Sequence, residues 1–225
     1  MTVLATPIGN RGDLSPRAAA ALTDADIVCA EDTRVTGKLL SMLGIKRRMV
    51  RLDEHAAAAK VAEVVAQAAN GANVVLASDA GTPLVSDPGV ALVDAAYWAG
   101  VALDSIPGPS SVTNALALSG FHARKFVFLG FLPKKQAGIR AELEPYRVSS
   151  MTIVFFDSPH RVSKTLICVQ DALGDRRVAV CREMTKLHQE VRRGRLSEAA
   201  TWALPGKGEY TIVIEGYRKG VAEDV

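Results

Sequence analysis

The sequence predicts an α/β fold in two parts: a first half built on a mostly parallel sheet with flanking helices, and a second half of mixed α/β structure. Up to residue 119, short apolar runs alternate with helical segments, as in parallel sheets that are covered on both faces. Beyond residue 120, the chain resumes with an aromatic-rich strand and shows more strand pairing. The 225 residues are enough for two small domains, which we expect at 1–119 and 120–225.

Five apolar runs of the first half are expected to be strands, at residues 3–5, 27–30, 49–52, 74–77 and 101–106. The segments between and after them are expected to be helices, at residues 16–22, 39–43, 56–69, 90–96 and 112–119. Ser15 and Asp87 each precede a proline and are predicted to cap the helices that follow them. Gly44 and Gly71 are predicted to end helices, because glycine accepts the left-handed backbone found there.

The second half is expected to contain strands at residues 126–131, 151–156, 177–182 and 210–215. A polar helix over 136–146 is expected to be broken by Gly138. The pair Ser158-Pro159 is typical of a helix start and predicts a helix that reaches about residue 173. Trp98 and Trp202 are predicted to lie in the cores.

Composition favours a folded protein without a membrane segment. Hydrophobic residues make up 48% and charged residues 23% of the chain, which allows a sizeable core and argues against disorder. No apolar run is long enough to cross a bilayer. Cys29, Cys168 and Cys181 are odd in number and lack metal-ligand spacing. We therefore expect buried free thiols in a reducing cytoplasm.

Basic residues are segregated along the chain, although the net charge of +3 alone does not identify a nucleic-acid partner. Residues 34–51 hold six basic and no acidic residues, and residues 124–140 hold five and none. Residues 182–195 hold five basic residues against two acidic ones. The three segments could meet on one phosphate-binding face, or they could remain separate solvated surfaces; the sequence leaves both possibilities open.

Several common catalytic motifs are missing, among them the phosphate-binding P-loop, the dinucleotide glycine motif, zinc-type His/Cys spacing and the serine nucleophile elbow. What remains is a set of polar loops after predicted strands, at residues 6–10, 31–34, 78–89, 107–111 and 157–161. Gly81 would let the backbone of its loop approach a ligand. Loops at the carboxyl ends of strands in an open α/β sheet bind small ligands, so we predict such a site and no metal site.

Eight stretches in chain order carry a resemblance to a known family: residues 5–10 with 13–18, 30–34, 78–89, 107–111, 128–133, 158–161, 182–188 and 207–210. They resemble the tetrapyrrole methylase family, two-domain α/β methyltransferases that use S-adenosyl-L-methionine. Among its branches, the chain is most similar to the one that methylates the ribose of a decoding-centre cytidine in 16S ribosomal RNA. The resemblance implies a tetrapyrrole-methylase-like fold, a homodimer, and 16S rRNA in the small ribosomal subunit as partner.

The resemblance also implies which residues hold the cofactor in a cleft between the two domains. These are Ile8, Gly9, Thr82, Pro83, Val85, Ser110, Ser111 and, on the adenosine side, Phe156, to which we add Gly81 of the central loop. His160 and Arg161 are expected to steady the helix near the adenosine. The asparagine that the family carries after His55 is missing here, which leaves the role of His55 open.

The implied chemistry is an in-line displacement in which a ribose 2′-oxygen attacks a sulfonium methyl group, and it needs no metal because the leaving group is a neutral thioether. Alignment can supply about 7–11 kcal/mol, and the weakly nucleophilic hydroxyl gains from a base or a cation. Lys186 and Arg34 are candidates for holding RNA phosphate or the developing alkoxide. Glu31, Asp32, Asp79 and Glu183 are candidates for orienting or deprotonating the hydroxyl.

Competing interpretations remain at this point. Asp32 and Arg34 could form a purely structural ion pair, Lys186 could be a solvated surface residue, and His188 could serve RNA binding or simply pack on the surface. At the level of function, the chain could methylate a corrin or porphyrin precursor, since tetrapyrrole carboxylates also attract cations. It could also be a small-subunit-binding protein without catalytic activity, although the intact cofactor loops argue against that.

Overall fold

The computed structural model describes residues 1–53 and 57–219, and the chain divides into two compact units, Met1–Ser110 and Ser111–Val225. The division precedes helix α5 (Ser111–Ser119), whereas the sequence suggested a boundary near Ser119. The reason is that α5 packs on strands of the second unit and so belongs to it. His55 lies outside the described residues.

The first unit contains a five-stranded sheet in the order β3-β2-β4-β1-β5, and every pair of neighbours is parallel. This confirms the predicted parallel sheet. All four residues of β2 and of β4 are buried, as expected for central strands covered on both faces. The strands are β1 (Thr2–Leu4), β2 (Ile27–Ala30), β3 (Arg48–Arg51), β4 (Val74–Ala77) and β5 (Asp104–Ile106).

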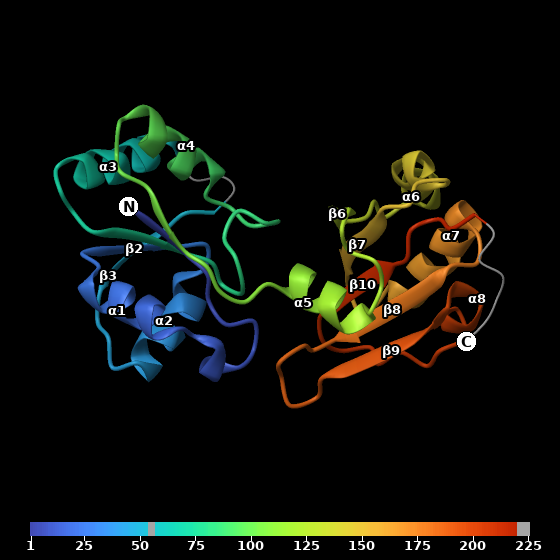
Figure 1. Ribbon diagram of the computed structural model, residues 1–225. Helices are drawn as coiled ribbons and strands as arrows, with labels where there is room; N and C mark the ends of the chain where they lie inside the picture. The colour runs from blue at the N-terminus through green and yellow to red at the C-terminus, as the bar shows by residue number, and fades with distance from the viewer. Residues whose placement is uncertain (54–56, 220–225) are drawn as a thin grey trace. The chain divides into compact units, whose positions relative to one another are not determined.

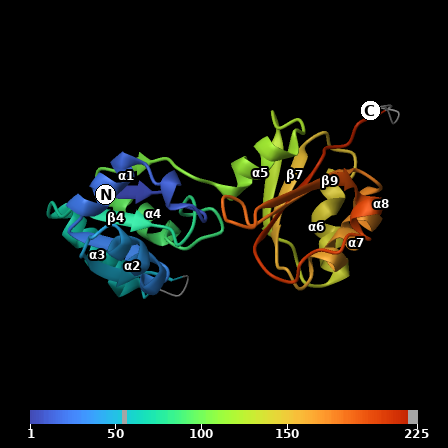
Figure 2. The ribbon, with the colours of Figure 1, turned by 90° about the horizontal axis from the view of Figure 1, so that it is seen from below.

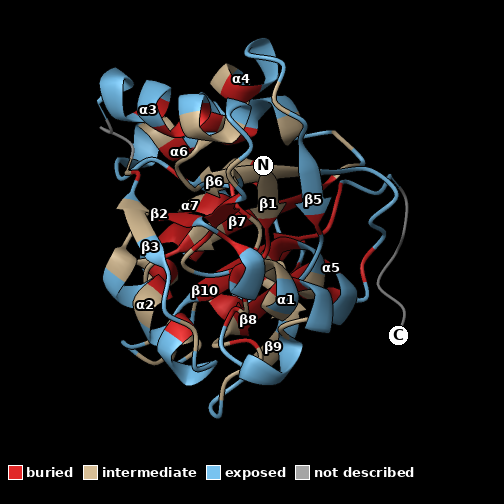
Figure 3. Ribbon diagram, turned by 90° about the vertical axis from the view of Figure 1, so that its left-hand side faces the viewer, coloured by how far each residue is buried: buried red, intermediate tan, exposed pale blue. Residues whose placement is uncertain are grey.

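Helices cover both faces of the first sheet (Figure 1). They are α1 (Pro16–Asp24), α2 (Thr33–Met42), α3 (Ala58–Ala69) and α4 (Val90–Trp98), with a 3₁₀ turn at Arg11–Asp13. On one face, Leu4 and Val28 pack with Leu22 of α1 and Leu40 of α2. On the other face, apolar residues of α3 and α4 form a second cluster with the alternate residues of the central strands, and Figure 3 shows these strands as largely buried.

Local signals explain two helix starts and mislead at a third. The Ser15 hydroxyl accepts a hydrogen bond from the Ala18 N–H at 3.1 Å, so Ser15 caps α1 as predicted. Asp32 caps α2 in the same way by accepting from the Arg34 N–H at 2.9 Å. The prediction that Asp87 caps α4 is wrong: Gly89 occupies that position with φ +116°, and the Asp87 carboxylate accepts from the Ser78 hydroxyl instead.

The second unit contains a five-stranded mixed sheet in the order β6-β7-β10-β8-β9. Strands β6 and β7 are parallel, and the other neighbours are antiparallel, which confirms the predicted mixed structure. Strand β9 was not foreseen, because its residues are mostly charged and it lies at the sheet edge, paired with β8 alone. The strands are β6 (Phe126–Phe131), β7 (Thr152–Asp157), β8 (Arg177–Arg182), β9 (Glu190–Arg195) and β10 (Tyr210–Ile214).

Helix α5 covers one face of this sheet, while α6 (Gln136–Leu143), α7 (Val162–Leu173) and α8 (Leu196–Ala199) cover the other (Figure 2). The prediction that Gly138 breaks this helix is wrong, because α6 runs unbroken through Gly138. It continues as a 3₁₀ turn at Glu144–Tyr146. Glycine is suited to this position because a Cβ there would come within 2.8 Å of the Pro133 side chain. Helix α7 begins at Val162, so Ser158-Pro159 forms the preceding turn and not the helix start.

The tryptophans and cysteines differ in burial, and Cys168, which was expected to be buried, is only partly so. Trp98 is 78% exposed, so its predicted core position is wrong. Trp202 is partly buried against the core of the second unit, and the Arg192 guanidinium lies over its ring. Cys29 and Cys181 are buried free thiols; burial, opposed at Cys29 by Arg48, raises their pKa values to about 12 and about 11.

Candidate active site

The carboxyl ends of β1 and β4 mark a change of direction in the first sheet. From β1 the chain crosses to β2, and from β4 it crosses past β1 to β5 on the opposite side. The helices of these two crossovers therefore lie on opposite faces of the sheet. The neighbouring strands β1 and β4 are therefore the switch point of this sheet, and the carboxyl ends of the strands at a switch point are where ligands bind in open α/β sheets.

The loops after β1 and β4 are joined by backbone hydrogen bonds. The Thr6 N–H donates to the Gly81 carbonyl at 2.9 Å, and the Gly81 N–H donates to the Thr6 carbonyl at 3.1 Å. The buried Thr6 hydroxyl donates to the Ser78 carbonyl at 2.9 Å. Gly81 has φ +88°, and a Cβ at this position would lie 3.2 Å from Cγ2 of Ile8. A side chain at residue 81 would therefore be strained both by the backbone and by its neighbour.

The loop after β5 joins the other two. The Thr82 hydroxyl donates to the Pro109 carbonyl at 3.3 Å. Gly108 packs so closely that a Cβ there would lie 3.0 Å from that of Ala5. Three loops that are distant in sequence thus meet at one sheet edge, and they meet through backbone groups and small side chains.

The structure brings the predicted cofactor residues of the first unit to this edge. Ile8 and Pro83 are buried in the joined loops, whereas Gly9 and Val85 are exposed. Ser110 directly follows Pro109, and the next predicted residue, Ser111, opens α5 as the first residue of the second unit.

The central loop, residues 78–89, has a fixed internal conformation. The Ser78 hydroxyl donates to the Asp87 carboxylate and accepts from the Ala80 N–H at 3.1 Å. Leu84 and Ser86 have φ values of +71° and +61°, a backbone that side chains rarely adopt. Burial raises the pKa of Asp87, against the opposing effect of the Ser78 hydrogen bond.

Asp79 and Asp32 lie together at the ends of β4 and β2. The Asp32 N–H donates to Oδ1 of Asp79 at 3.3 Å. The Asp32 carboxylate accepts from Arg34 Nε at 2.9 Å and forms an ion pair with the Arg34 side chain, which is 87% exposed. The predicted residues Asp32, Arg34 and Asp79 therefore form one group, and the ion pair that the sequence left as an alternative is present.

The pKa values of the two carboxylates move in opposite directions. Hydrogen bonds from Arg34 hold the pKa of Asp32 far below its usual range. Burial, together with the nearby Asp32 charge and against the Asp32 N–H bond, raises the pKa of Asp79. Adjacent carboxylates with separated pKa values are a common arrangement in acid–base sites.

Glu183 and Lys186 form a second group, in the second unit. Lys186 Nζ donates to Glu183 Oε1 at 2.9 Å and to Glu209 Oε2 at 2.8 Å. Burial alone would lower the pKa of Lys186, but the bonds to both carboxylates outweigh it and raise that pKa. Burial would likewise raise the pKa of Glu183, and the bonds from Lys186 and from the Glu209 N–H outweigh it and lower that pKa. Lys186 is thus held between two carboxylates.

Phe156, the last residue but one of β7, lies within an aromatic group. Its ring lies edge to face with those of Phe128 and Phe131, with centroid distances of 4.8 and 5.6 Å. The next residue, Asp157, is buried and pairs with Arg161, whose Nη2 also donates to the Leu132 carbonyl at 2.7 Å. Arg161 therefore fastens the β6–α6 loop to the end of β7, while His160 is exposed.

Sequence reasoning missed three partners in these groups. They are Asp87 as the acceptor for Ser78, Glu209 as the second carboxylate on Lys186, and Asp157 as the partner of Arg161. The only available signal was position, since Asp87 and Glu209 lie within stretches that carried the family resemblance. Of the basic segments, 34–51 belongs to the first unit, and 124–140 and 182–195 to the second. Within residues 1–53 and 57–219, no group of three metal-ligating side chains occurs and no helix could span a membrane.

The chain has the fold of two solved structures. The chain superposes on diphthine synthase with a TM-score of 0.75 at 17% identity, covering 95% of this chain and 89% of that one. It superposes on the methyltransferase CobJ with a TM-score of 0.69 at 18% identity, covering 97% and 96%. At such identities, the likeness establishes the fold.

Sequence comparison then gives the family. The chain belongs to the tetrapyrrole (corrin/porphyrin) methylases, whose family model matches residues 1–200. It is 48% identical to ribosomal RNA small subunit methyltransferase I of Mycobacterium tuberculosis, over 94% of this chain and 76% of that protein. It is 41% identical to the protein of the same name from Thermotoga maritima, over 96% and 98%.

The loop residues at the carboxyl ends of β1, β4 and β5 fit S-adenosylmethionine, the cofactor of methyltransferases with this fold. Gly81 has no Cβ to crowd Ile8 and the Pro109 carbonyl, so the three loops can pack closely around the place proposed for the ligand. The loops meet through neutral backbone and hydroxyl groups, which suit the ribose and the amino acid part. Asp79 and Asp87 belong to the central loop, and their carboxylates suit a ligand with a sulfonium cation.

Proposed function

We propose that this chain transfers the methyl group of S-adenosylmethionine to ribosomal RNA, and specifically to the ribose 2′-oxygen of a decoding-centre cytidine in 16S rRNA. The observation that carries the proposal is the similarity to proteins named ribosomal RNA small subunit methyltransferase I. Their identities reach 48% and extend over nearly the whole chain, so both units are included. We further propose that the chain works on the small subunit in the cytoplasm and as a homodimer.

Residues of both units would hold the cofactor: Ile8, Gly9, Gly81, Thr82, Pro83, Val85, Ser110, Ser111 and Phe156. When bound, S-adenosylmethionine supplies an electrophilic methyl group on a sulfonium whose departure leaves a neutral thioether. The joined loops are rigid before binding, because hydrogen bonds tie the β1 loop to the β4 loop and the β4 loop to the β5 loop. Little ordering of the chain is then needed when the ligand binds, which favours affinity and alignment.

Among the carboxylates, we propose Asp79 as the group that orients or deprotonates the ribose hydroxyl. Its raised pKa makes it a better proton acceptor than an ordinary aspartate. Asp32 is less suited to this role because Arg34 holds its charge. Asp32 instead orients Asp79 through its N–H and keeps Arg34 at the strand end. Glu31 and Glu183 are the alternatives.

Among the cations, we propose that Arg34 meets an RNA phosphate. Its side chain is largely exposed and can keep its bond to Asp32 while other N–H groups of the guanidinium contact the ligand. Lys186 would have to leave one of two carboxylates in order to bind phosphate. Its more direct effect is to fix the loop between β8 and β9, and stabilisation of a developing alkoxide is the alternative role.

A labelling experiment tests the proposal and its alternatives together. The protein is incubated with S-adenosylmethionine that is tritiated in its methyl group, in three separate reactions. One contains 30S subunits, one free 16S rRNA and one a tetrapyrrole precursor. We expect label in RNA, and 2′-O-methylcytidine after nuclease digestion and mass spectrometry. Label in the tetrapyrrole alone would establish the corrin or porphyrin alternative. Binding to 30S subunits without any transfer would favour the non-catalytic alternative.

A further inference from the structure

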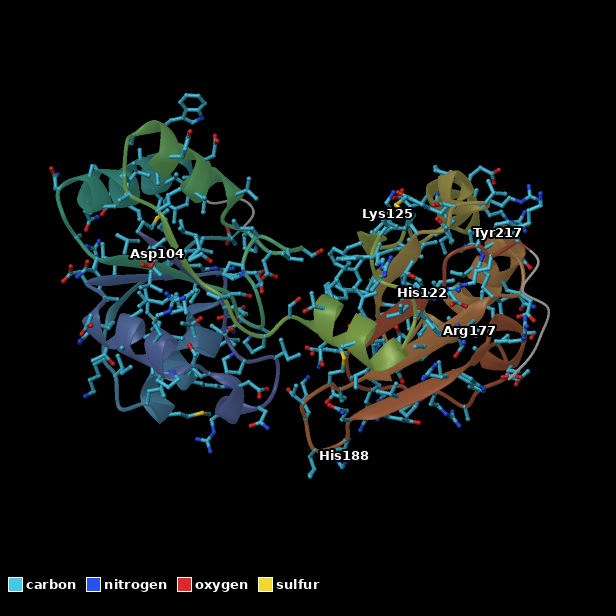
Figure 4. All side chains as sticks on the ribbon, in the orientation of Figure 1. Asp104, His122, Lys125, Arg177, His188 and Tyr217 are labelled. Atoms are coloured by element: carbon cyan, nitrogen blue, oxygen red, sulfur yellow. The ribbon has the colours of Figure 1, made fainter. Side chains whose placement is uncertain are left out.

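The loop between β8 and β9, residues 183–189, ends in an unusual turn. The Gln189 N–H donates to the Lys186 carbonyl at 3.1 Å, so Leu187 and His188 are the two central residues of a four-residue turn. Leu187 is 93% exposed, and Figure 4 shows His188 on the outside of its unit at this turn. Turns favour glycine, proline, asparagine, aspartate and serine. An exposed leucine is therefore an uncommon residue at the centre of a turn.

The part of the loop just before this turn has a strained backbone. Glu183 and Thr185 have φ values of +49° and +65°, and the backbone penalty is largest for a β-branched residue such as threonine. The Thr185 hydroxyl oxygen is buried without a hydrogen-bond partner. Such strain persists where the surrounding structure imposes it, and it is concentrated at functional sites.

Several contacts below the turn impose that conformation. Lys186 is bonded to Glu183 and Glu209, and the Glu183 N–H donates to the Glu209 carbonyl at 3.0 Å. Arg182 Nε donates to the Lys207 carbonyl at 2.9 Å. Met184 is buried and anchors the loop. The loop therefore presents its exposed leucine on a rigid base, with the cost of ordering already met by the fold.

The hairpin that carries the turn is basic. Residues 177–195 hold six arginine and lysine side chains against two glutamates, a net charge of +4 with His188 neutral. Carboxylates outside the hairpin pair with three of the six cations: Glu215 with Arg177, Glu209 with Lys186 and Asp175 with Arg195. A rigid apolar tip on a basic hairpin matches the two chemistries of a nucleic acid, since phosphates attract the cations and an apolar side chain can enter between bases. Leucine is among the side chains that proteins insert at base steps.

We infer that Leu187 is a wedge that enters a base step of the RNA next to the target nucleotide, with His188 beside it at the strand. The inference rests on the proposed function and specifies how the RNA is engaged. A ribose within a continuous stack is held by both neighbours, whereas opening one step frees it to approach the methyl donor in line. Leu187 is thus a positioning residue for the substrate and has no part in the methyl transfer itself.

The test uses the RNA fragment that the labelling experiment identifies, with 2-aminopurine placed directly 3′ of the methylated cytidine. Wild type and the volume-conserving variant Leu187→Met should raise the 2-aminopurine fluorescence on binding, because the base unstacks. Leu187→Ser should leave it near the free value and lower kcat/KM about tenfold, with unchanged affinity for S-adenosylmethionine. Val148→Ser, at a 74%-exposed valine in the same unit, should behave as wild type.

A second RNA separates wedging from simple contact. When the base 3′ of the target is replaced by an abasic site, no step needs opening, and Leu187→Ser should match wild type within about twofold. Wild-type fluorescence and kinetics in Leu187→Ser would overturn the inference, as would an equal loss on the abasic RNA. A change in sedimentation would overturn it in favour of a contact with a second copy. Absence of RNA methylation by wild type would instead overturn the proposed function, and this inference with it.

Discussion

Gly81→Ala is expected to weaken both the first unit and its binding of S-adenosylmethionine. The residue has φ +88°, and a left-handed backbone costs an L-residue about 1–2 kcal/mol. Restricting the unfolded chain returns about 0.4–1 kcal/mol. The added Cβ would also lie 3.2 Å from Ile8 Cγ2 and 3.5 Å from the Pro109 carbonyl oxygen, and crowding of this kind costs about 1–3 kcal/mol. We expect a net loss of about 2 kcal/mol in the free energy of unfolding.

Gly71→Ala is the matched control. Gly71 has φ +95°, and a Cβ there meets nothing within 4 Å, so the variant carries the backbone penalty without the contact. Urea unfolding followed by circular dichroism gives both free energies, and calorimetry gives both affinities for S-adenosylmethionine. We expect Gly81→Ala to lose at least about 1 kcal/mol more than Gly71→Ala, and it alone should lose affinity. Equal stability losses with equal, undiminished affinities would refute the packing of the three loops around residue 81.

Three further outcomes follow. Asp79→Asn should lower kcat by about 10² to 10⁴-fold without changing affinity for S-adenosylmethionine; in wild type, the rate should fall as pH drops through the raised pKa of Asp79, at a higher pH than for an ordinary aspartate. Lys186→Met should cost about 1–2 kcal/mol in unfolding free energy. It should also diminish the loss of stability on the acid side. Lys186 lowers the pKa of Glu183 in the folded protein, which gives stability above the unfolded-state pKa of Glu183, and this stability is lost as the pH falls through the folded-state pKa. Trp98→Ala should change stability by less than about 0.5 kcal/mol, whereas Phe155→Ala, in the buried core of the second unit, should cost about 3–5 kcal/mol. Urea midpoints measure these two changes and that of Lys186→Met.

Most elements of the fold could be predicted because buried parallel strands appear in the sequence as continuous apolar runs. Strand β2 matches its predicted residues, as do β4, β6 and β8. Strand β9 escaped prediction because three of its six residues are arginines, and its place is set by backbone pairing with β8. Gly138 misled because glycine lowers helix stability by only about 1 kcal/mol, and here glycine is the residue that lets the helix lie close to Pro133.

The sequence indicated which loops form the candidate site, but it did not indicate which side chains pair with one another there. Polar residues after apolar runs indicated the strand ends, and the structure joins those loops at Thr6, Gly81 and Thr82. Which side chains pair depends on how each loop folds back. Asp87 had the local sequence of a helix cap, yet the fold turns it toward Ser78, and Lys186 gains Glu209 from 23 residues away. Local rules cannot report such contacts.

Backbone strain links the two loops to which we assign function. Across residues 1–53 and 57–219, the left-handed residues other than glycine are Leu84, Ser86, Glu183 and Thr185. At about 1 kcal/mol each, they consume a substantial part of a typical folding stability of about 5–15 kcal/mol. Glycine would relieve the strain at every one of these positions, but it would remove the packing of Leu84 against the core and the bond from Lys186 to Glu183. Leu84 and Ser86 shape the proposed cofactor loop, and Glu183 and Thr185 shape the loop that carries the proposed RNA wedge. A strained loop conformation would therefore help to bind each of the two substrates of the transfer reaction.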